Sequence, residues 1–462
     1  MKQNKFFIIG ITLVATLGGL LFGYDTAVIS GAVDPLKAFF QLDAEHYGNL
    51  ATFYHGATVS SALLGCILGG AISGIFATRF GRKKSLIIAS ILFFISAVGS
   101  GYPEMIFFNS GTAISTLLVS FNVYRIIGGI GVGLASAICP MYIAEMAPAE
   151  IRGKLVSWNQ FAIIFGMLIV YFVNYFIVFG KDPVWINATG WRYMFVSESF
   201  VAATFGILLF LVPETPRYLA LIHNDNKALS ILTKINGTEK AKAILAEIKE
   251  TVHEKVEHVL TYGWKVLIIG ILLSVFQQAV GINVVLYYAP TIFKGLGFGN
   301  DAAMWQTVIM GIVNIIFTLV AIFTVDKFGR KPLLIIGSTG MAIGMFAIGA
   351  LAHFQIIGVS TLIFIVIYTA AFMMSWGPIC WVLISEIFPN TIRGKAVAIA
   401  VAAQWIANFV VSSTFPSLEA FSITFTYILY GVMSVLSALF VWKMVPETKG
   451  KTLEDMSKLW KK

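Results

Sequence analysis

The sequence predicts an all-α polytopic membrane protein in which twelve transmembrane helices form two six-helix, pseudo-symmetric halves. Its composition and its recurring motifs both predict this class. Of the 462 residues, 58% are hydrophobic and only 12% are charged, whereas a globular protein has about 45–50% apolar and about 25% charged residues. At about 20 residues per span, this apolar content is enough for about twelve helices. The composition excludes a soluble multi-domain enzyme, a disordered protein and a peripheral membrane protein.

Hydropathy divides the chain into twelve apolar stretches and one long polar interruption. The predicted spans are about 6–32, 52–77, 84–107, 121–146, 154–179, 192–212, 264–292, 303–325, 332–354, 360–387, 396–416 and 424–445. The interruption shows helical periodicity over 226–258, which favours a solvated helical linker over a helix on the membrane surface. The predicted organisation is an N-terminal half (1–212), a cytoplasmic linker (213–263), a C-terminal half (264–445) and a cytoplasmic tail (446–462).

The net charge of +9 follows the topology. Lysine and arginine concentrate in every second connection, and the alternate connections carry acidic residues. By the positive-inside rule, both termini and the basic loops face the cytoplasm, as in a multi-pass protein of the inner cell membrane. This placement argues against a nucleic-acid partner. The three cysteines, an odd number in apolar stretches, give neither a disulfide framework nor a metal site, and we expect no cofactor.

Three motifs recur in the same order in the two halves, which predicts an internal duplication. TRFGRKK at 78–84 recurs as DKFGRKP at 326–332, and YIAEMAPAEIRGK at 142–154 recurs as LISEIFPNTIRGK at 383–395. VPET at 212–215 recurs at 445–448. The copies follow spans 2, 4 and 6 of each half and therefore lie on one side of the membrane. Two parallel six-helix repeats are typical of major facilitator transporters.

These motifs resemble those of the sugar-porter family of major facilitator transporters over essentially the whole chain. The resemblance is carried by GRKK and GRKP, YRIIGGIGVG, EMAPAEIRGK, PETPRYL, QQAVGINVVLYYAP, WGPICW, SEIFPNTIRGK and PETKGKTLE. It implies the major facilitator fold and uptake of an aldose, D-xylose or a hexose such as D-glucose, by proton symport with alternating access. It also implies a functional monomer whose partners are a monosaccharide, a proton and the bilayer.

Two charges within spans need a partner or a water-filled cavity, because each costs about 2.5–3.5 kcal/mol at mid-bilayer. Asp25 lies in the first span and Arg125 in the fourth, and we expect them to pair. A pair that opens and closes with the cavity would let Asp25 couple sugar to protons, which the resemblance supports. The alternative is a structural ion pair. His55 is a weaker candidate proton carrier. A histidine at a helix end or in an external loop, with no role in proton transfer, is the favoured interpretation.

Side-chain amides supply the expected substrate chemistry, because each both donates and accepts hydrogen bonds, as sugar hydroxyls do. Five lie within spans: Gln160, Gln277, Gln278, Asn283 and Gln404. A lone amide commonly bonds a neighbouring helix instead. On a regular helix Asn283 would lie about 140° from Gln278. We therefore predict that span 7 breaks around 281–289 and forms an extracellular gate there.

Gly377-Pro378 predicts a second break, in span 10. Trp381, Trp405 and Phe22 could offer flat apolar faces to a sugar ring, although most span aromatics face lipid or the core. The resemblance places cavity aromatics at Phe22, Trp381 and Trp405. It assigns sugar contact to Gln160, Gln277, Gln278, Asn283, Trp381 and Gln404, and less directly to Tyr287, Gly377 and Asn408.

Repeated charges at the cytoplasmic ends of the spans predict a gate. The set is Arg82, Glu145, Arg152 and Glu214, mirrored by Arg330, Glu386, Arg393 and Glu447. Pairing of these acids and bases across the halves would hold the cytoplasmic side shut. Topological signalling by Arg and Lys alone would not explain why the acids repeat. Thr78 stands where the family usually has Asp, so asymmetric pairing is expected.

Met167 lies on the same helical face as Gln160. A xylose-transporting member of the family has Gln there, and a thioether donates no hydrogen bond. Met167 therefore argues against D-xylose as the substrate and is compatible with a hexose. The alternatives are a facilitative uniporter in which Asp25 is structural and, less favoured, a transporter-like sugar sensor. The sequence shows no ATP-binding motif or nucleophile–base set, so no enzyme activity is expected.

Overall fold

The computed structural model describes residues 5–105, 113–148, 151–252, 257–295, 297–356, 358–389, 391–449 and 460, and every regular element in them is a helix. The long helices are α1 (Lys5–Phe39), α3 (Ala51–Arg79), α4 (Arg82–Gly101), α5 (Ile114–Met146), α6 (Arg152–Val178), α8 (Trp191–Leu211), α12 (Trp264–Ala279), α15 (Asn300–Phe328), α16 (Arg330–His353), α17 (Val359–Met373), α19 (Arg393–Phe421) and α20 (Ile423–Met444). The shorter ones are α2 (Ala44–Tyr47), η1 (Gly48–Leu50), α7 (Pro183–Trp185), η3 (Ile186–Gly190), α9 (Pro216–Leu221), α10 (Asp225–Asn236), α11 (Thr238–Val252), α13 (Ile282–Tyr287), α14 (Ala289–Gly295) and α18 (Trp376–Ile387).

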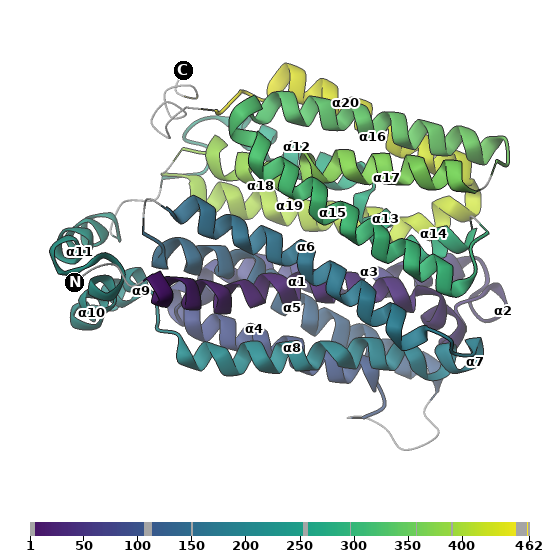
Figure 1. Cartoon of the computed structure of the whole chain (residues 1–462), viewed down its shortest axis with the longest axis horizontal. Helices are drawn as coiled ribbons and strands as arrows, with labels where there is room; N and C mark the ends of the chain where they lie inside the picture. The colour runs from purple at the N-terminus through teal and green to yellow at the C-terminus, as the bar shows by residue number, and fades with distance from the viewer. Residues whose placement is uncertain are drawn as a thin grey trace.

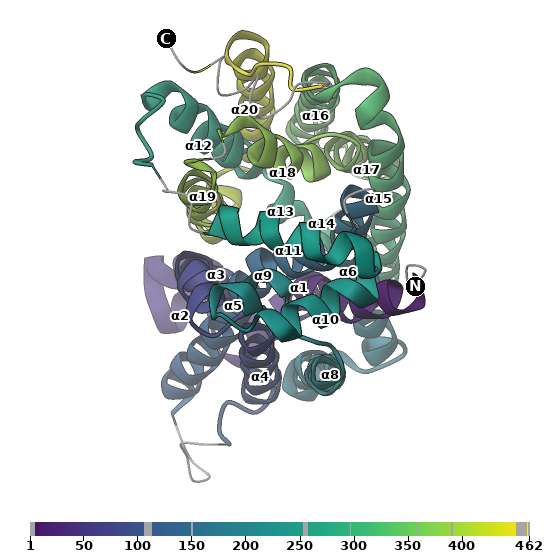
Figure 2. The ribbon, with the colours of Figure 1, turned by 90° about the vertical axis from the view of Figure 1, so that its left-hand side faces the viewer.

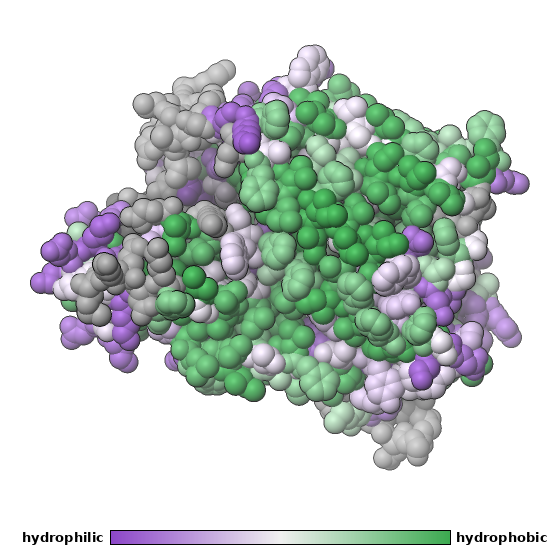
Figure 3. Space-filling model, in the orientation of Figure 1, coloured by the Kyte–Doolittle hydropathy of each residue, from purple (hydrophilic) through white to green (hydrophobic). Residues whose placement is uncertain are grey.

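Twelve helical segments in the described residues are long and apolar enough to cross a membrane, which confirms the twelve predicted spans. On the face shown in Figure 3, apolar residues cover the middle of the molecule, and polar residues gather towards its two ends. This distribution is expected where the middle of each helix faces hydrocarbon and its ends face water.

The helices form two layers (Figure 1). One layer, the N-terminal set, consists of α1, α3–α6 and α8, and the other, the C-terminal set, consists of α12–α20. The two sets meet where α3 packs on α19 and α6 on α15, and where α1 reaches α13 and α14. Helices α9–α11 lie at one end, called here the linker end, and α2, α7 and α14 lie at the opposite end.

Close helix packing depends on small residues at the contacts. A Cβ atom added to Gly129 on α5 would lie 1.8 Å from the carbonyl oxygen of Ala62 on α3. Glycine there lets the two backbones approach, which is how helices pack tightly in the absence of a hydrophobic driving force between them.

The polar linker folds as helices, as its periodicity predicted. Helices α9, α10 and α11 pack around a small apolar core that includes Leu219, Ala228, Leu232 and Leu245. Figure 2 shows α10 and α11 in front of the bundle when it is viewed from the linker end. Most of the predicted tail at 446–462 lies outside the described residues.

Candidate functional site

The seventh span is interrupted twice, within the segment where a break was predicted. Helix α12 ends at Ala279, α13 begins at Ile282, and α14 begins at Ala289. Between the first two, Gly281 has φ 90° and ψ 17°, a left-handed conformation that only glycine adopts at no steric cost. A Cβ atom at Gly281 would also lie 2.8 Å from the Tyr430 ring. The chain therefore turns sharply here, and the predicted break is confirmed.

The break brings four side-chain amides into one chain of hydrogen bonds. Asn283 Nδ2 donates to Gln278 Oε1, and Gln278 Nε2 donates to Gln277 Oε1 over 3.0 Å. Gln404 Nε2, from α19, donates to the same Gln277 oxygen. On a straight helix Asn283 and Gln278 would point apart, so the turn at Gly281 is what joins them. The resulting row of donors and acceptors suits a ligand rich in hydroxyl groups.

Gln277 also ties this row to the tenth span. Its Nε2 donates to the carbonyl oxygens of Trp376 and Gly377, over 3.1 and 3.3 Å. The tenth span does break, but earlier than Gly377-Pro378 predicted: α17 ends at Met373 and α18 begins at Trp376. Pro378 falls in the first turn of α18, where a helix tolerates a missing N–H group because that group would have no intrahelical partner.

The remaining predicted sugar-contacting residues lie on five helices: α1, α6, α13, α18 and α19. Phe22 on α1 and Trp405 on α19 form a ring pair with centroids 5.6 Å apart. Asn408 donates to the hydroxyl of Tyr287 over 3.4 Å. Trp381 on α18 and Gln160 on α6 are half-buried, and neither belongs to the chain of amides. Met167, on the same helix as Gln160, is buried.

Asn314 is one of the buried amides that the sequence analysis missed. Asn314 on α15 is fully buried, and neither atom of its side-chain amide has a hydrogen-bond partner among the described residues. An unpaired buried amide is costly in a membrane interior. Its position in an apolar span, like that of Gln404, was the signal that could have identified it.

The expected ion pair between the first and fourth spans is formed. Arg125 Nη1 donates to Asp25 Oδ1 over 2.7 Å, and Nη2 donates to the Asp25 backbone carbonyl oxygen over 3.1 Å. The two side chains are 1% and 0% exposed, and the guanidinium lies over the Phe195 ring, 5.2 Å from its centroid. Each charge depends on the other for stabilisation, because water does not reach either of them.

A second buried acid beside this pair was missed by the sequence analysis. Glu198 on α8 is fully buried and lies close enough to interact with Asp25 and Arg125. It lies close enough to Asp25 for a side-chain hydrogen bond between the two carboxyl groups. Two carboxyl groups therefore lie near one guanidinium, and the hydrogen bonds of Arg125 go to Asp25. Glu198 is an acid inside an apolar span, and that property could have identified it, as it did Asp25.

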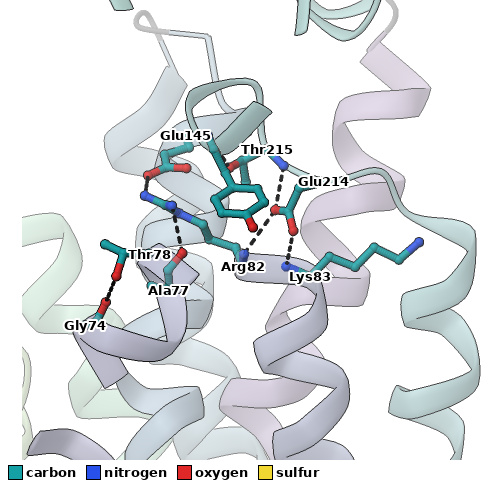
Figure 4. A network of polar contacts seen from close by, with 9 residues as sticks. Gly74, Ala77, Thr78, Arg82, Lys83, Glu145, Glu214 and Thr215 are labelled. Carbon is teal, nitrogen blue, oxygen red and sulfur yellow. Dashed lines mark hydrogen bonds and ion pairs between the residues drawn. The ribbon is translucent and has the colours of Figure 1, made fainter. Parts of the chain in front are cut away.

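Figure 4 shows the charge network of the N-terminal set at the linker end. Arg82 Nη2 donates to Glu145 Oε1 over 2.6 Å, while the backbone N–H groups of Arg82 and Lys83 donate to Glu214. Thr78 donates to the Gly74 carbonyl oxygen of its own helix. It therefore satisfies its hydroxyl locally instead of taking part in a charge pair.

The C-terminal set repeats this arrangement. Arg330 Nη2 donates to Glu386 Oε1 over 3.0 Å, and the N–H groups of Arg330 and Lys331 donate to Glu447. Arg82 and Arg330 were expected to pair with acids across the halves, but the ion pairs Arg82–Glu145 and Arg330–Glu386 each join residues of one set. The duplication explains this difference, because each copy places its Arg at the start of one helix, beside the Glu at the end of a neighbouring helix.

The other two arginines of the predicted gate begin helices that join the sets. Arg152 is the first residue of α6 and is exposed, and Arg393 is the first residue of α19. These are the helices that pack against α15 and α3 of the other set. Both arginines therefore lie at the linker end of a contact between sets.

The two glutamates that accept backbone hydrogen bonds differ in their electrostatics. Burial raises the pKa of Glu214 above its usual value, although hydrogen bonds from backbone N–H groups oppose this rise. Burial acts in the same direction on Glu447, but there the backbone N–H groups outweigh it and the pKa is lowered. The duplicated motifs are therefore similar in geometry and unequal in charge stabilisation.

His55 is buried within the first turns of α3, close to the helix end that was favoured for it. Its Nε2 lies 3.3 Å from the Val33 carbonyl oxygen on α1, and its ring lies edge-on to Tyr288 at 6.4 Å. Because a carbonyl oxygen only accepts, Nε2 carries a hydrogen. These contacts place His55 where α1, α3 and the end of α13 meet.

The chain is similar to known sugar transporters over its whole length. The family model described as "Sugar (and other) transporter" matches residues 11–460. The D-xylose-proton symporter of Escherichia coli is 55% identical over 99% of this chain and 97% of its own length. The arabinose-proton symporter of Bacillus subtilis is 41% identical over 98% and 95%. The glucose facilitated diffusion protein of Zymomonas mobilis is 38% identical over 100% and 99%.

Solved structures agree with these relatives. The inward-open conformation of the xylose transporter from Escherichia coli has a TM-score of 0.88 at 55% identity, covering 98% of this chain and all of that chain. The major facilitator superfamily proton:xylose symporter bound to 6-bromo-6-deoxy-D-glucose has a TM-score of 0.85 at 55% identity, covering 99% and 100%. Together with the twelve spans, these similarities confirm the predicted fold. The chain belongs to the sugar transporter family of the major facilitator superfamily.

Proposed function

We propose that this protein takes up an aldose by proton symport. The observation that carries the proposal is the fully buried Asp25–Arg125 ion pair, which lies in the N-terminal set while the row of amides lies in the C-terminal set. A carboxylate that is paired and dry in one state can take a proton when the cavity opens to water. Two relatives named as proton symporters, of D-xylose and of arabinose, support the coupling.

The cycle begins with Asp25 protonated and with the molecule open at the end opposite the linker end. The sugar binds the amides and aromatic rings, and spans 1 and 7 then close above it. Next, the two sets separate at the linker end, where Arg152 and Arg393 begin the helices that join them. The sugar leaves first, after which Asp25 releases its proton and pairs again with Arg125. The ion pair in this structure corresponds to that last state, which fits the similarity to the inward-open transporter.

The proposal also covers topology. The linker end, both termini, the linker (213–263) and the tail (446–462) face the cytoplasm, and residues 1–212 and 264–445 move as two halves of one functional monomer. The grouping of the helices into two sets supports the movement, and the basic connections support the orientation.

The substrate is an aldopyranose. The relatives named for xylose and arabinose support a pentose, whereas buried Met167 and the relative named for glucose support a hexose. Thermal shifts of purified protein with D-xylose, D-glucose and D-galactose distinguish these sugars. A shift with none of the three would contradict the assignment.

Facilitated diffusion is the second candidate, favoured by the relative from Zymomonas mobilis. In that case Asp25 would only hold α1 against α5. Sugar added to energy-depleted cells separates the two: symport makes the medium alkaline, and a uniporter leaves its pH unchanged.

A further inference from the structure

Asp34, near the end of α1, is bonded to two residues of the C-terminal set. Its Oδ1 accepts a hydrogen bond from Thr291 Oγ1 over 2.9 Å. Its Oδ2 accepts one from Lys294 Nζ over 2.9 Å. Both donors belong to α14, the short helix that follows the double break of span 7. One carboxylate therefore holds α14 by both of its oxygens.

We propose that Asp34, with Thr291 and Lys294, is a latch that positions α14 over the opposite end and keeps that end closed. The inference rests on the proposed alternating access and deepens it. It assigns closure to a charged contact between the sets, in addition to the apolar packing of spans 1 and 7.

The mechanical argument starts from the breaks. Helix α14 has seven residues and is separated from α13 by Tyr288 and from α15 by a turn in which Gly297 has φ 86°. A helix this short is not stable alone, so its position depends on its partners. It packs on α1 and α15, and the two bonds to Asp34 lie on the α1 side.

The electrostatic argument compares this pair with the one at Asp25. The side chains of Lys294 and Asp34 are 33% and 35% exposed, against 1% and 0% for Arg125 and Asp25. A cavity of about 430 Å³ adjoins the pair, lined among others by Ser30, Asn187 and Asn300. Water can hydrate both charges when they separate, so opening leaves no buried ion. A contact that must open once per cycle requires this property.

A second contact between the sets reports on closure without involving the latch. Ser417 Oγ on α19 donates to Thr52 Oγ1 on α3 over 3.1 Å. The double substitution Thr52→Cys/Ser417→Cys places two thiols at this contact. Their disulfide yield in membranes under mild oxidation measures how often the opposite end is closed. The native cysteines are all buried.

In this double-cysteine background, Asp34→Ala is expected to lower the initial rate of disulfide formation about two- to fivefold, the range of an exposed ion pair. Lys294→Ala and Thr291→Val each remove one bond and should lower it less. Asp34→Lys/Lys294→Asp restores the pair and should recover most of the rate. Raising the salt concentration should slow the reaction in the parent and leave Asp34→Ala unchanged.

Asp43→Ala is the matched control, since Asp43 is an exposed acid that pairs with His46 of its own segment. It should react at the parent rate. Size-exclusion profiles and sugar-induced thermal shifts establish that each variant is folded. An Asp34→Ala rate equal to the parent's, or a charge swap no better than Asp34→Ala, would overturn the latch. Cross-linking needs neither sugar nor protons. The latch proposal can therefore be refuted while the proposal of proton symport holds, and proton symport can be refuted while the latch proposal holds.

Discussion

Gln277 is the residue on which the proposed sugar site depends most, because it joins three helices. It donates to the carbonyl oxygens of Trp376 and Gly377, and it accepts from Gln278 and Gln404. Gln277→Leu keeps similar volume and removes all four hydrogen bonds. We expect this variant to fold and to lose most of its affinity for sugar.

The size of both effects follows from these bonds. Three of them join different helices, and an interhelical side-chain hydrogen bond in a membrane protein contributes about 0.6 kcal/mol on average, so stability should fall by about 2 kcal/mol. Sugar binding loses the contact of Gln277 and the alignment of Gln278. At about 0.5–1.5 kcal/mol for each hydrogen bond, two lost bonds correspond to about 1–3 kcal/mol. This free energy raises Kd about 5- to 150-fold.

The assay is the thermal shift of purified protein across a sugar titration, which gives stability and affinity from one experiment. Asn174→Leu is the matched control: Asn174 is a buried amide on α6 that donates to the Val28 carbonyl oxygen, away from the row of amides. It should lower stability and leave the sugar dependence unchanged. If Gln277→Leu keeps the parent's affinity, or Asn174→Leu loses as much, the amides do not form the site.

Further variants test three other parts of the structure. Gly281→Ala forces a left-handed conformation and places its Cβ against Tyr430, so melting temperature and uptake should both fall, whereas Gly10→Ala, with open space around it, should lower neither. Glu198→Gln replaces a carboxyl group that is fully buried beside Asp25 with a neutral amide, which costs less to bury. Its melting temperature at pH 7 should equal or exceed the parent's, and a clear decrease would contradict this view of Glu198. The lowered pKa of Glu447 stabilises the fold above the usual glutamate pKa, and this contribution is lost as the pH falls through the lowered value. Glu447→Gln should therefore melt below the parent at pH 7 and at the parent's temperature in acid. At Glu214 the raised pKa makes ionisation unfavourable, so Glu214→Gln should lower the melting temperature at pH 7 by less than Glu447→Gln does.

The sequence predicted those features that depend on local chemistry or on repetition. Apolar runs predicted the spans, the glycine within QQAVGINVV predicted the break at Gly281, and the scarcity of charge in the spans predicted the partnership of Asp25 with Arg125. In each case a few neighbouring residues, or one unusual residue type, carried the information.

The features that the sequence did not predict are contacts between distant helices. The sequence analysis gave neither Asp34 nor Lys294 a role, because nothing in either segment shows that α14 returns to α1. Glu198 needs three helices to meet before its proximity to Asp25 appears. The repetition of acids and bases drew attention to the charges at the linker end, but their pairing within each set depends on the packing of neighbouring helices.

Coupling through Asp25 is the central claim, and active accumulation by Asp25→Asn in proteoliposomes tests it most directly. Asn keeps the shape of the side chain and cannot carry the proton. With an inward proton gradient, the variant should exchange labelled sugar across the membrane and fail to concentrate it, while the parent concentrates it. Accumulation against a sugar gradient by Asp25→Asn would contradict the account.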